Sequence, residues 1–175
     1  MIRVKLFINY PFIYFSGVVK QPQTIARRHR VPEVRQKMDI EEEIIRMWRE
    51  NKDNGFVSKS PGMGRGLFSS KNIPPHTLVG EYQGKQCSGA KARSFSNNSP
   101  SNYALFWVDD GRMFMRDAEK SRCKLRFMNH SKTDYNCKIV KIKIDGIYRP
   151  LMVTTKFIKM GEELLWDYND PKLPF

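Results

Sequence analysis

The side chains best suited to chemistry lie in the segment 126–131, which reads RFMNHS. Asn129, His130 and Ser131 offer an amide, an imidazole and a hydroxyl beside bulky apolar residues, and this combination suits the wall of a ligand site better than a core strand. A turn capped by Asn129 and Ser131 is the alternative that the segment alone leaves open. Two distant segments favour the site: GMGRGLF at 62–68 and GEELLWDY at 161–168.

The glycine-rich segment 62–66 predicts a bend that a ligand can approach closely, because Gly64 and Gly66 have no side chain to obstruct it. Taken alone, this segment is equally typical of an ordinary turn. The sequence does not favour a nuclease or a kinase, since it shows neither a phosphate-cradling loop with its lysine nor a cluster of carboxylates for a metal ion.

In this order, the three segments resemble those of the SET-domain protein lysine methyltransferases, whose pattern is a GxG turn, an RFxNHS-type segment and an ELxxDY-type segment. The resemblance covers about residues 39–170. It implies a mainly β (α+β) fold of several small twisted sheets, with a C-terminal pseudoknot and an N-terminal flanking helix. It also implies transfer of a methyl group from S-adenosyl-L-methionine to a lysine side chain.

That reaction makes physical demands on the site. The lysine amine must lose its proton, and a dry aromatic channel beside the positively charged sulfur of the cofactor disfavours the ammonium form. Nitrogen, methyl carbon and sulfur must lie in line, so positioning supplies much of the rate. Backbone carbonyls and a tyrosine oxygen can stabilise the methyl group through C–H···O contacts.

The resemblance implies two groups of cofactor contacts. The backbone of Met63, Gly64 and Arg65 is expected to hold the methionine part of the cofactor. Asn129 and His130 are expected to contact its amino-acid and adenine ends. For His130, ordinary core packing is the alternative.

Tyrosines are expected to form the rest of the site. Tyr168 matches the catalytic tyrosine of the family, Tyr82 a tyrosine that lines the lysine channel, and Tyr103 one beside the cofactor. The alternatives are a core tyrosine for Tyr168 and plain strand aromatics for the other two.

The branch that the sequence resembles most is the histone H4 lysine-20 monomethyltransferases. NHSK at 129–132 with NC at 136–137, IDG at 144–146, and the absence of a cysteine cluster on either side of the domain all favour it. Trp166 departs from that branch, which has a tyrosine where the number of added methyl groups is controlled. Loss of the hydroxyl favours more methylation and added bulk favours less, so we expect mono- or dimethylation. Leu125 also departs, because a small residue is usual before the arginine.

The composition favours an acidic partner. The 175 residues include 31 Lys and Arg against 18 Asp and Glu, a formal charge of +13, which suits DNA, RNA or a nucleosome surface; plain solubility is the alternative. The expected partners are a histone H4 tail or nucleosome, with nucleosomal DNA held by the basic surface, and the expected location is the nucleus. We expect a monomer with no membrane contact. The three cysteines lack metal-ligand spacing, so no metal site is expected.

The sequence also leaves open another kind of substrate and another class of function. A methyltransferase of a non-histone protein would use the same residues. A basic chromatin-binding module without turnover is the alternative from another class, which Trp166 and Leu125 keep open.

The remaining pattern predicts one helix and then many short strands. The helix covers 39–54, with a capping box from Asp39 and Glu42 and a stop at Gly55. Its apolar stripe is formed by Ile40, Ile44, Met47 and Trp48. A polar loop is expected at 94–101. Strands are expected at 77–82, 103–108, 113–116, 138–144 and 148–155, the last four as two hairpins turned by DDG and DG.

These elements divide the chain into an N-terminal extension or basic arm at 1–38, a flanking helix at 39–55, a SET domain at 56–170 and a short tail at 171–175. The aromatic start at 1–20 mimics a secretory signal, but Asn9 and Pro11 interrupt it and it is too short to span a membrane, so a strand or tail is favoured.

Overall fold

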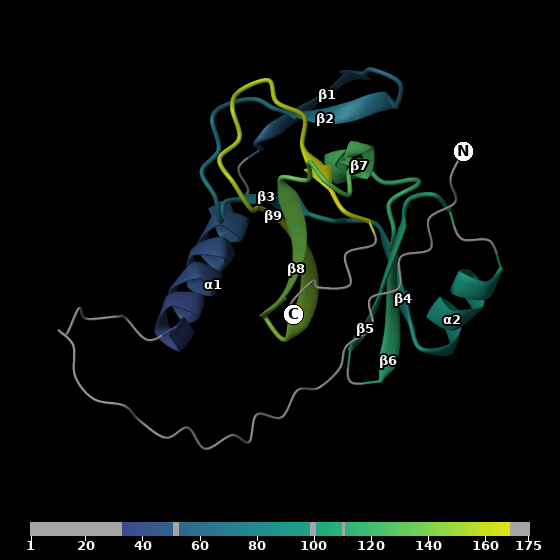
Figure 1. Cartoon of the computed structure of the whole chain (residues 1–175). Helices are drawn as coiled ribbons and strands as arrows, with labels where there is room; N and C mark the ends of the chain where they lie inside the picture. The colour runs from purple at the N-terminus through teal and green to yellow at the C-terminus, as the bar shows by residue number, and fades with distance from the viewer. Residues whose placement is uncertain (1–32, 51–52, 99–100, 110, 169–175) are drawn as a thin grey trace, which may run out of the picture.

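The computed structural model describes residues 33–50, 53–98, 101–109 and 111–168 (Figure 1). The predicted extension therefore lies outside the described residues except for its last part, and so does the predicted tail. The elements are α1 Glu33–Glu50, β1 Gly55–Ser60, β2 Gly64–Ser69, β3 Leu78–Glu81, β4 Lys85–Ser88, α2 Ala90–Asn97, β5 Ala104–Asp109, β6 Arg112–Asp117, the 3₁₀ helix η1 Lys124–Phe127, β7 Asn129–His130, β8 Cys137–Ile144, β9 Ile147–Thr154 and β10 Leu165–Trp166.

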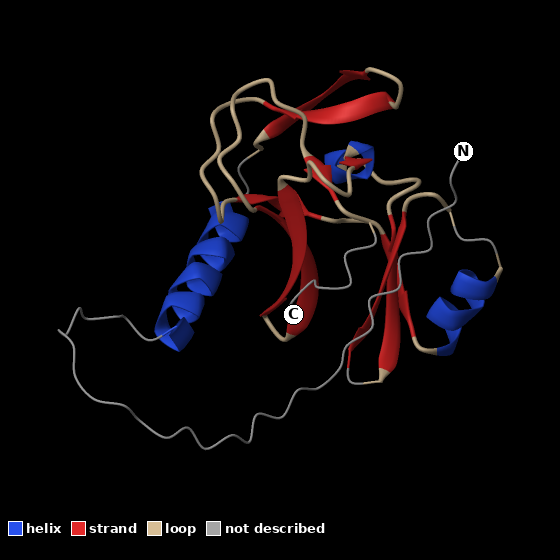
Figure 2. Cartoon of the chain, viewed as in Figure 1, coloured by secondary structure: helices blue, strands red, loops and turns tan. Residues whose placement is uncertain are grey.

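The strands form three small sheets, as predicted for this mainly β fold (Figure 2). One is the hairpin β1–β2, one has the order β4-β6-β5, and the largest has the order β3-β9-β8-β10-β7. The two predicted hairpins are confirmed as β5–β6 and β8–β9. The main core packs between the sheets and includes Leu67, Ile73, Leu105, Met128 and Ile139, all nearly inaccessible to solvent.

The C-terminal strand β10 is interleaved between β7 and β8, which are consecutive in the chain, and it pairs in parallel with both. The loop that joins β7 to β8 is tied to β10 by two backbone hydrogen bonds: Ser131 N–H donates to Trp166 O at 3.2 Å, and Asn136 N–H to Leu165 O at 3.0 Å. This interleaving corresponds to the predicted C-terminal pseudoknot. It places the 161–168 segment directly beside the 126–131 segment.

The flanking helix is longer at its start and shorter at its end than predicted. It runs over Glu33–Glu50, so Asp39 lies inside it and does not cap it. Good helix-forming residues precede Asp39 and extend the helix. At the other end, Asn54 is buried and donates a side-chain hydrogen bond to Leu78 O at 2.7 Å, and Gly55 already belongs to β1.

The apolar stripe of α1 was predicted correctly. Ile40, Ile44, Met47 and Trp48 all belong to a core cluster that α1 shares with β3, β8 and β9. In this view α1 stands beside the β8–β9 hairpin (Figure 1). Among the described residues, no helix is both long and apolar enough to cross a membrane.

The prediction of a polar loop at 94–101 is wrong for 94–97, because 90–97 forms the helix α2. Ala92 and Ser96 are buried, and Phe95 packs against the cluster that contains Phe106 of β5 and Met115 of β6. The helix begins with the good helix formers of 90–93, and tertiary packing of Phe95 supports its serine-containing second half.

Candidate active site

The turn of the β1–β2 hairpin forms one side of the site. Ser60 pairs with Gly64, and Met63 N–H donates to Ser60 O at 3.2 Å, which closes the turn. Gly64 has φ of +81°, a conformation that favours glycine, and apart from its chain neighbours no residue has an atom within 4 Å of the position that a Cβ would occupy. Open space therefore lies beside the backbone at Gly64, while the neighbouring side chains of Met63 and Arg65 are exposed.

Asn129 links this hairpin to the segment 161–168 through hydrogen bonds. Its side-chain amide donates to Glu163 Oε1 at 2.8 Å and to Arg65 O at 3.2 Å. The other carboxylate oxygen, Glu163 Oε2, accepts from Ser60 Oγ at 2.9 Å. Gly66 makes room for this carboxylate, since a Cβ there would lie less than 3.0 Å from it. Three segments far apart in the sequence thus meet at one side chain.

Tyr168 lies on the opposite side, fixed at its hydroxyl and at its backbone. The hydroxyl donates to Met128 O at 2.6 Å, and Tyr168 N–H donates to His130 Nδ1 at 3.1 Å. Burial, and to a smaller extent the charge of Tyr103, raises the pKa of Tyr168 to about 12. The phenol is therefore neutral at physiological pH, with its proton directed to a carbonyl.

Tyr82 and Trp166 complete the aromatic side. Tyr82 is buried, and its hydroxyl donates to Tyr103 O at 2.8 Å. Burial is the main cause that raises the pKa of Tyr82 well above its ordinary value, with smaller contributions from Cys123 and Tyr168. The Trp166 ring is also buried, and its centroid lies 4.8 Å from that of Tyr168.

A single cavity of about 290 Å³ joins these two sides. It is lined by Met63, Arg65, Tyr82, Asn102, Tyr103, Ala104, Leu105, Leu125, Arg126, Phe127, Met128, Asn129, Trp166 and Tyr168. Seven of the nine predicted site residues therefore line one cavity. The other two residues are neighbours of lining residues in the chain. Gly64 stands between Met63 and Arg65. His130 follows Asn129, and its Nδ1 accepts a hydrogen bond from Tyr168 N–H.

Sequence reasoning missed two arginine contacts in the cavity wall. The guanidinium carbon of Arg126 lies 4.3 Å from the centre of the Tyr103 ring, and Arg126 Nη1 donates to Ala118 O at 3.0 Å. The guanidinium carbon of Arg65 lies 4.3 Å from the centre of the Phe127 ring. Arg126 and Phe127 open the same RFMNHS segment, so their position in that segment could have indicated them.

Asn136 was also missed as a structural anchor of the site. It is buried, its amide donates to Glu163 O at 2.8 Å, and its Oδ1 accepts from Leu165 N–H at 2.9 Å. It therefore holds the backbone that leads to Trp166. Nothing in the spacing of the sequence signals this contact.

The site consists of aromatic rings, carbonyl oxygens, amides and guanidinium groups. Among the described residues, no group of three or more His, Cys, Asp or Glu side chains could hold a metal ion. Such a wall suits a cationic or methylated ligand, through ring faces and oxygen acceptors.

The chain is similar to several named methyltransferases. It is 32% identical over 120 residues to "Histone-lysine N-methyltransferase set-1" of Caenorhabditis elegans, a match that covers 65% of this chain and 50% of that protein. It is 30% identical over 115 residues to "N-lysine methyltransferase KMT5A" of Xenopus tropicalis, covering 62% of this chain and 34% of that protein. The chain thus spans half or less of the length of these two relatives.

Solved structures share the fold. CpSET8 from Cryptosporidium matches with a TM-score of 0.61 at 22% identity, over 83% of this chain and 71% of that one. An apo ctPRC2 structure with mutations in Ezh2 matches with a TM-score of 0.60 at 27% identity, over 72% of this chain and 16% of that one. The family model described as SET domain matches residues 64–169, more than half of the chain, which therefore belongs to the SET-domain family.

Proposed function

We propose that this chain is an S-adenosyl-L-methionine-dependent protein-lysine N-methyltransferase that acts on a histone tail. The observation that carries the proposal is the single cavity that is lined by Met63 and Arg65 of the hairpin turn and by Tyr82 and Tyr168. A cofactor at the hairpin and a lysine among the tyrosines would meet within it. The relatives named as lysine methyltransferases support the same reaction.

The residues present fit the proposed cofactor. When bound, it supplies a methyl group attached to a positively charged sulfur. The open space beside Gly64 admits a ligand against the backbone of Met63, Gly64 and Arg65. Asn129 lines the same cavity while its amide holds Arg65 O and Glu163, and the ring faces of the cavity suit a cation. His130 would act from behind the wall, through Tyr168.

The tyrosine side suits the methyl acceptor. Tyr82, Trp166 and Tyr168 together present aromatic rings to this side, and removal of water around a lysine amine lowers its pKa and frees its lone pair. Because the Tyr168 proton is donated to Met128 O, the lone pairs of the Tyr168 oxygen stay available as acceptors for C–H groups. Tyr103 joins both sides, since its ring lines the cavity and its carbonyl holds Tyr82.

We further propose that lysine 20 of histone H4 is the target and that the products are mono- or dimethyllysine. The NHSK, NC and IDG segments of the sequence support this branch. The similarity to KMT5A is compatible with it, although set-1, SETD2 and other relatives match at comparable identity. The buried Trp166 ring fills space next to Tyr168 and favours few methyl groups.

Transfer of labelled methyl groups tests the proposal. The protein is incubated with labelled cofactor and, in turn, with nucleosomes, free histones and an unrelated protein extract, with Tyr168→Phe as the control. Label on histone H4, located by mass spectrometry, supports the target. Label only in the extract moves the substrate to a non-histone protein. DNA binding without any label favours a chromatin-binding module without turnover.

We also propose that the protein is a monomer that docks on nucleosomal DNA in the nucleus. The net charge of +13 supports the docking. Phosphate contacts release counterions, so the affinity for DNA should fall linearly with salt on a log–log scale. Gel-shift titrations between low and physiological salt test the docking, and light scattering tests the monomer. Affinity that does not change with salt would contradict the docking.

A further inference from the structure

The backbone just after β3 is held by β9 and by side chains. Tyr82 N–H donates to Pro150 O of β9 at 2.9 Å. Tyr82 O accepts from Arg116 Nη1 at 3.1 Å. Gln83 N–H donates to Cys123 Sγ at 3.4 Å, and Gln83 O accepts from Ser121 Oγ at 3.1 Å. Side chains thus fix three backbone groups just beyond the end of the strand. The position of the Tyr82 side chain in the cavity wall depends on these contacts.

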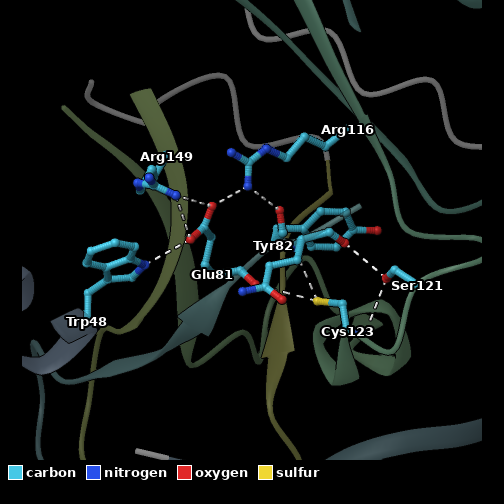
Figure 3. A network of polar contacts seen from close by, with 8 residues as sticks. Trp48, Glu81, Tyr82, Arg116, Ser121, Cys123 and Arg149 are labelled. Carbon is cyan, nitrogen blue, oxygen red and sulfur yellow. Dashed lines mark hydrogen bonds and ion pairs between the residues drawn. The ribbon is translucent and has the colours of Figure 1, made fainter. Parts of the chain in front are cut away.

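Glu81 orients the arginine that holds Tyr82. Arg116 Nη1 donates both to the Glu81 carboxylate and to Tyr82 O, so one nitrogen links the two (Figure 3). The side chains of Glu81 and Arg116 are only 5% and 7% exposed. A buried guanidinium is costly without its anion, so Arg116 depends on Glu81 to stay at this position.

Two further groups converge on the same carboxylate. Trp48 Nε1 donates to Glu81 Oε2 at 2.8 Å, and Arg149 Nη1 lies 3.4 Å from each Glu81 oxygen (Figure 3). The Arg149 guanidinium carbon also lies 4.5 Å from the centre of the Trp48 ring. Trp48 belongs to α1, Arg149 to β9 and Arg116 to β6. Glu81 therefore joins the flanking helix to two sheets, next to the residue that lines the cavity.

Tyr82 is fixed at both ends by these contacts. Its carbonyl is held by Arg116 and its hydroxyl donates to Tyr103 O at 2.8 Å. The ring between the two ends is 5% exposed and forms part of the cavity wall. A shift of the carbonyl end would therefore move the ring against the space proposed for the lysine.

We propose that Glu81 is a positioning residue for methyl transfer. Through Arg116 it sets the position of Tyr82. Through Trp48 it links the flanking helix α1 to the contacts that hold Tyr82. The role in methyl transfer depends on the proposed function, whereas the placement of Tyr82 does not. Loss of the Glu81 charge should therefore affect the acceptor side of the cavity and leave the cofactor side unchanged.

Kinetics separate this role from a purely structural one. Glu81→Gln keeps the shape of the side chain and removes its charge, so we expect kcat to fall by about tenfold, because small displacements of a positioned group reduce rates strongly. The affinity for the cofactor, measured by calorimetry, should stay within about twofold. Asp109→Asn is the matched control: Asp109 is a partly buried carboxylate 2.8 Å from Lys141 Nζ and does not line the cavity. It should change neither quantity, and equal losses in both variants would overturn the proposal.

A spectroscopic measurement decides the placement without any turnover. In protein labelled with 3-fluorotyrosine, the Tyr82 signal is assigned by its loss in Tyr82→Phe. We expect Glu81→Gln to shift or broaden that signal, and Trp48→Phe, which keeps a ring beneath Arg149, to change it less in the same direction. Asp109→Asn should leave it unchanged.

The outcomes are distinct. A wild-type protein that transfers no methyl group refutes the proposed function, while the fluorine spectrum still decides the placement of Tyr82. A folded Glu81→Gln protein with an unchanged Tyr82 signal overturns the proposal. If Glu81→Gln does not fold, an unchanged signal in Trp48→Phe overturns it.

Discussion

The hydroxyl of Tyr168 donates a hydrogen bond of 2.6 Å to the backbone carbonyl of Met128. Tyr168 follows β10 and Met128 precedes β7, so this bond joins two segments that the interleaving of β10 brings together. It also fixes the direction of the phenol proton. The lone pairs of the phenol oxygen are thereby left as acceptors.

Tyr168→Phe should remove most of the activity and little of the stability. The variant keeps the ring and loses the oxygen, so we expect roughly a hundredfold fall in kcat/KM. Loss of one partly buried hydrogen bond should reduce the free energy of unfolding by about 1 kcal/mol. Methyl transfer assays and urea denaturation measure the two effects. A variant with wild-type activity would show that the hydroxyl has no part in the reaction.

The stability of the wild-type protein should fall at high pH more steeply than that of Tyr168→Phe. Burial raises the pKa of Tyr168 to about 12 in the folded protein, while an unfolded tyrosine has a pKa near 10. The folded state therefore binds more protons between these values, and stability decreases as the pH rises through this range, by up to about 1.4 kcal/mol per pH unit.

Urea denaturation at several pH values from about 8 to 11 measures this difference. The stability advantage of the wild type over Tyr168→Phe should shrink as the pH rises above the pKa of free tyrosine. Two curves that remain parallel would mean that Tyr168 titrates normally in the folded protein.

Much of the geometry of the candidate site could be predicted from the sequence, because each motif is local and the order of the motifs is specific. The turn at Gly64, the amide of Asn129 and the phenol of Tyr168 lie in three short segments, and the fold brings all three to one cavity or its edge. The hairpins β5–β6 and β8–β9 were also predictable, because glycine turns separate strands of alternating or apolar residues.

The remaining features depend on contacts that leave no periodic signal. Glu81 meets Trp48 and Arg149, which lie 33 and 68 residues away in the chain. Helix α2 forms because Phe95 packs on a sheet, although its sequence resembles a polar loop. In α1, Asp39 has the residue type of a cap but lies inside the helix. Tertiary contacts decide the first two cases, and a single sequence does not display them. In the third case, the helix-forming residues before Asp39 extend the helix.

Gly66→Ala should weaken cofactor binding while leaving the fold intact. An added Cβ would lie within 3.0 Å of the Glu163 carboxylate, which must then move away from Asn129 and Ser60. The affinity for the cofactor, measured by calorimetry, should fall by about tenfold, equivalent to about 1.4 kcal/mol. The obstacle is the end of a side chain, so a small loss of stability is expected.

Gly84→Ala is the contrasting variant. A Cβ there would lie within 3.0 Å of the backbone of Asp117 and Ala118, which cannot move without disturbing β6. We expect it to lose more stability than Gly66→Ala, by more than about 2 kcal/mol. The reverse order of stabilities, measured by thermal denaturation, would contradict the close approaches seen at these two glycines.

Trp166 should limit the number of methyl groups by its bulk. It is 4% exposed, and its ring centroid lies 4.8 Å from that of Tyr168 on the cavity wall. Trp166→Phe shortens the side chain and opens space, so we expect mass spectrometry to show a shift toward di- and trimethyllysine. A loss of stability of about 1–2 kcal/mol is expected, because the space left in the core is only partly refilled.

Trp166→Tyr separates volume from hydrogen bonding at the same position. The side chain introduced by Trp166→Tyr has a ring of the same size as the one introduced by Trp166→Phe. Its added hydroxyl can hold a water molecule near the amine and occupy the opened space. We therefore expect Trp166→Tyr to add fewer methyl groups than Trp166→Phe. If both variants instead keep the wild-type product, the bulk of Trp166 does not control the outcome, and another part of the wall must limit the space around the lysine nitrogen.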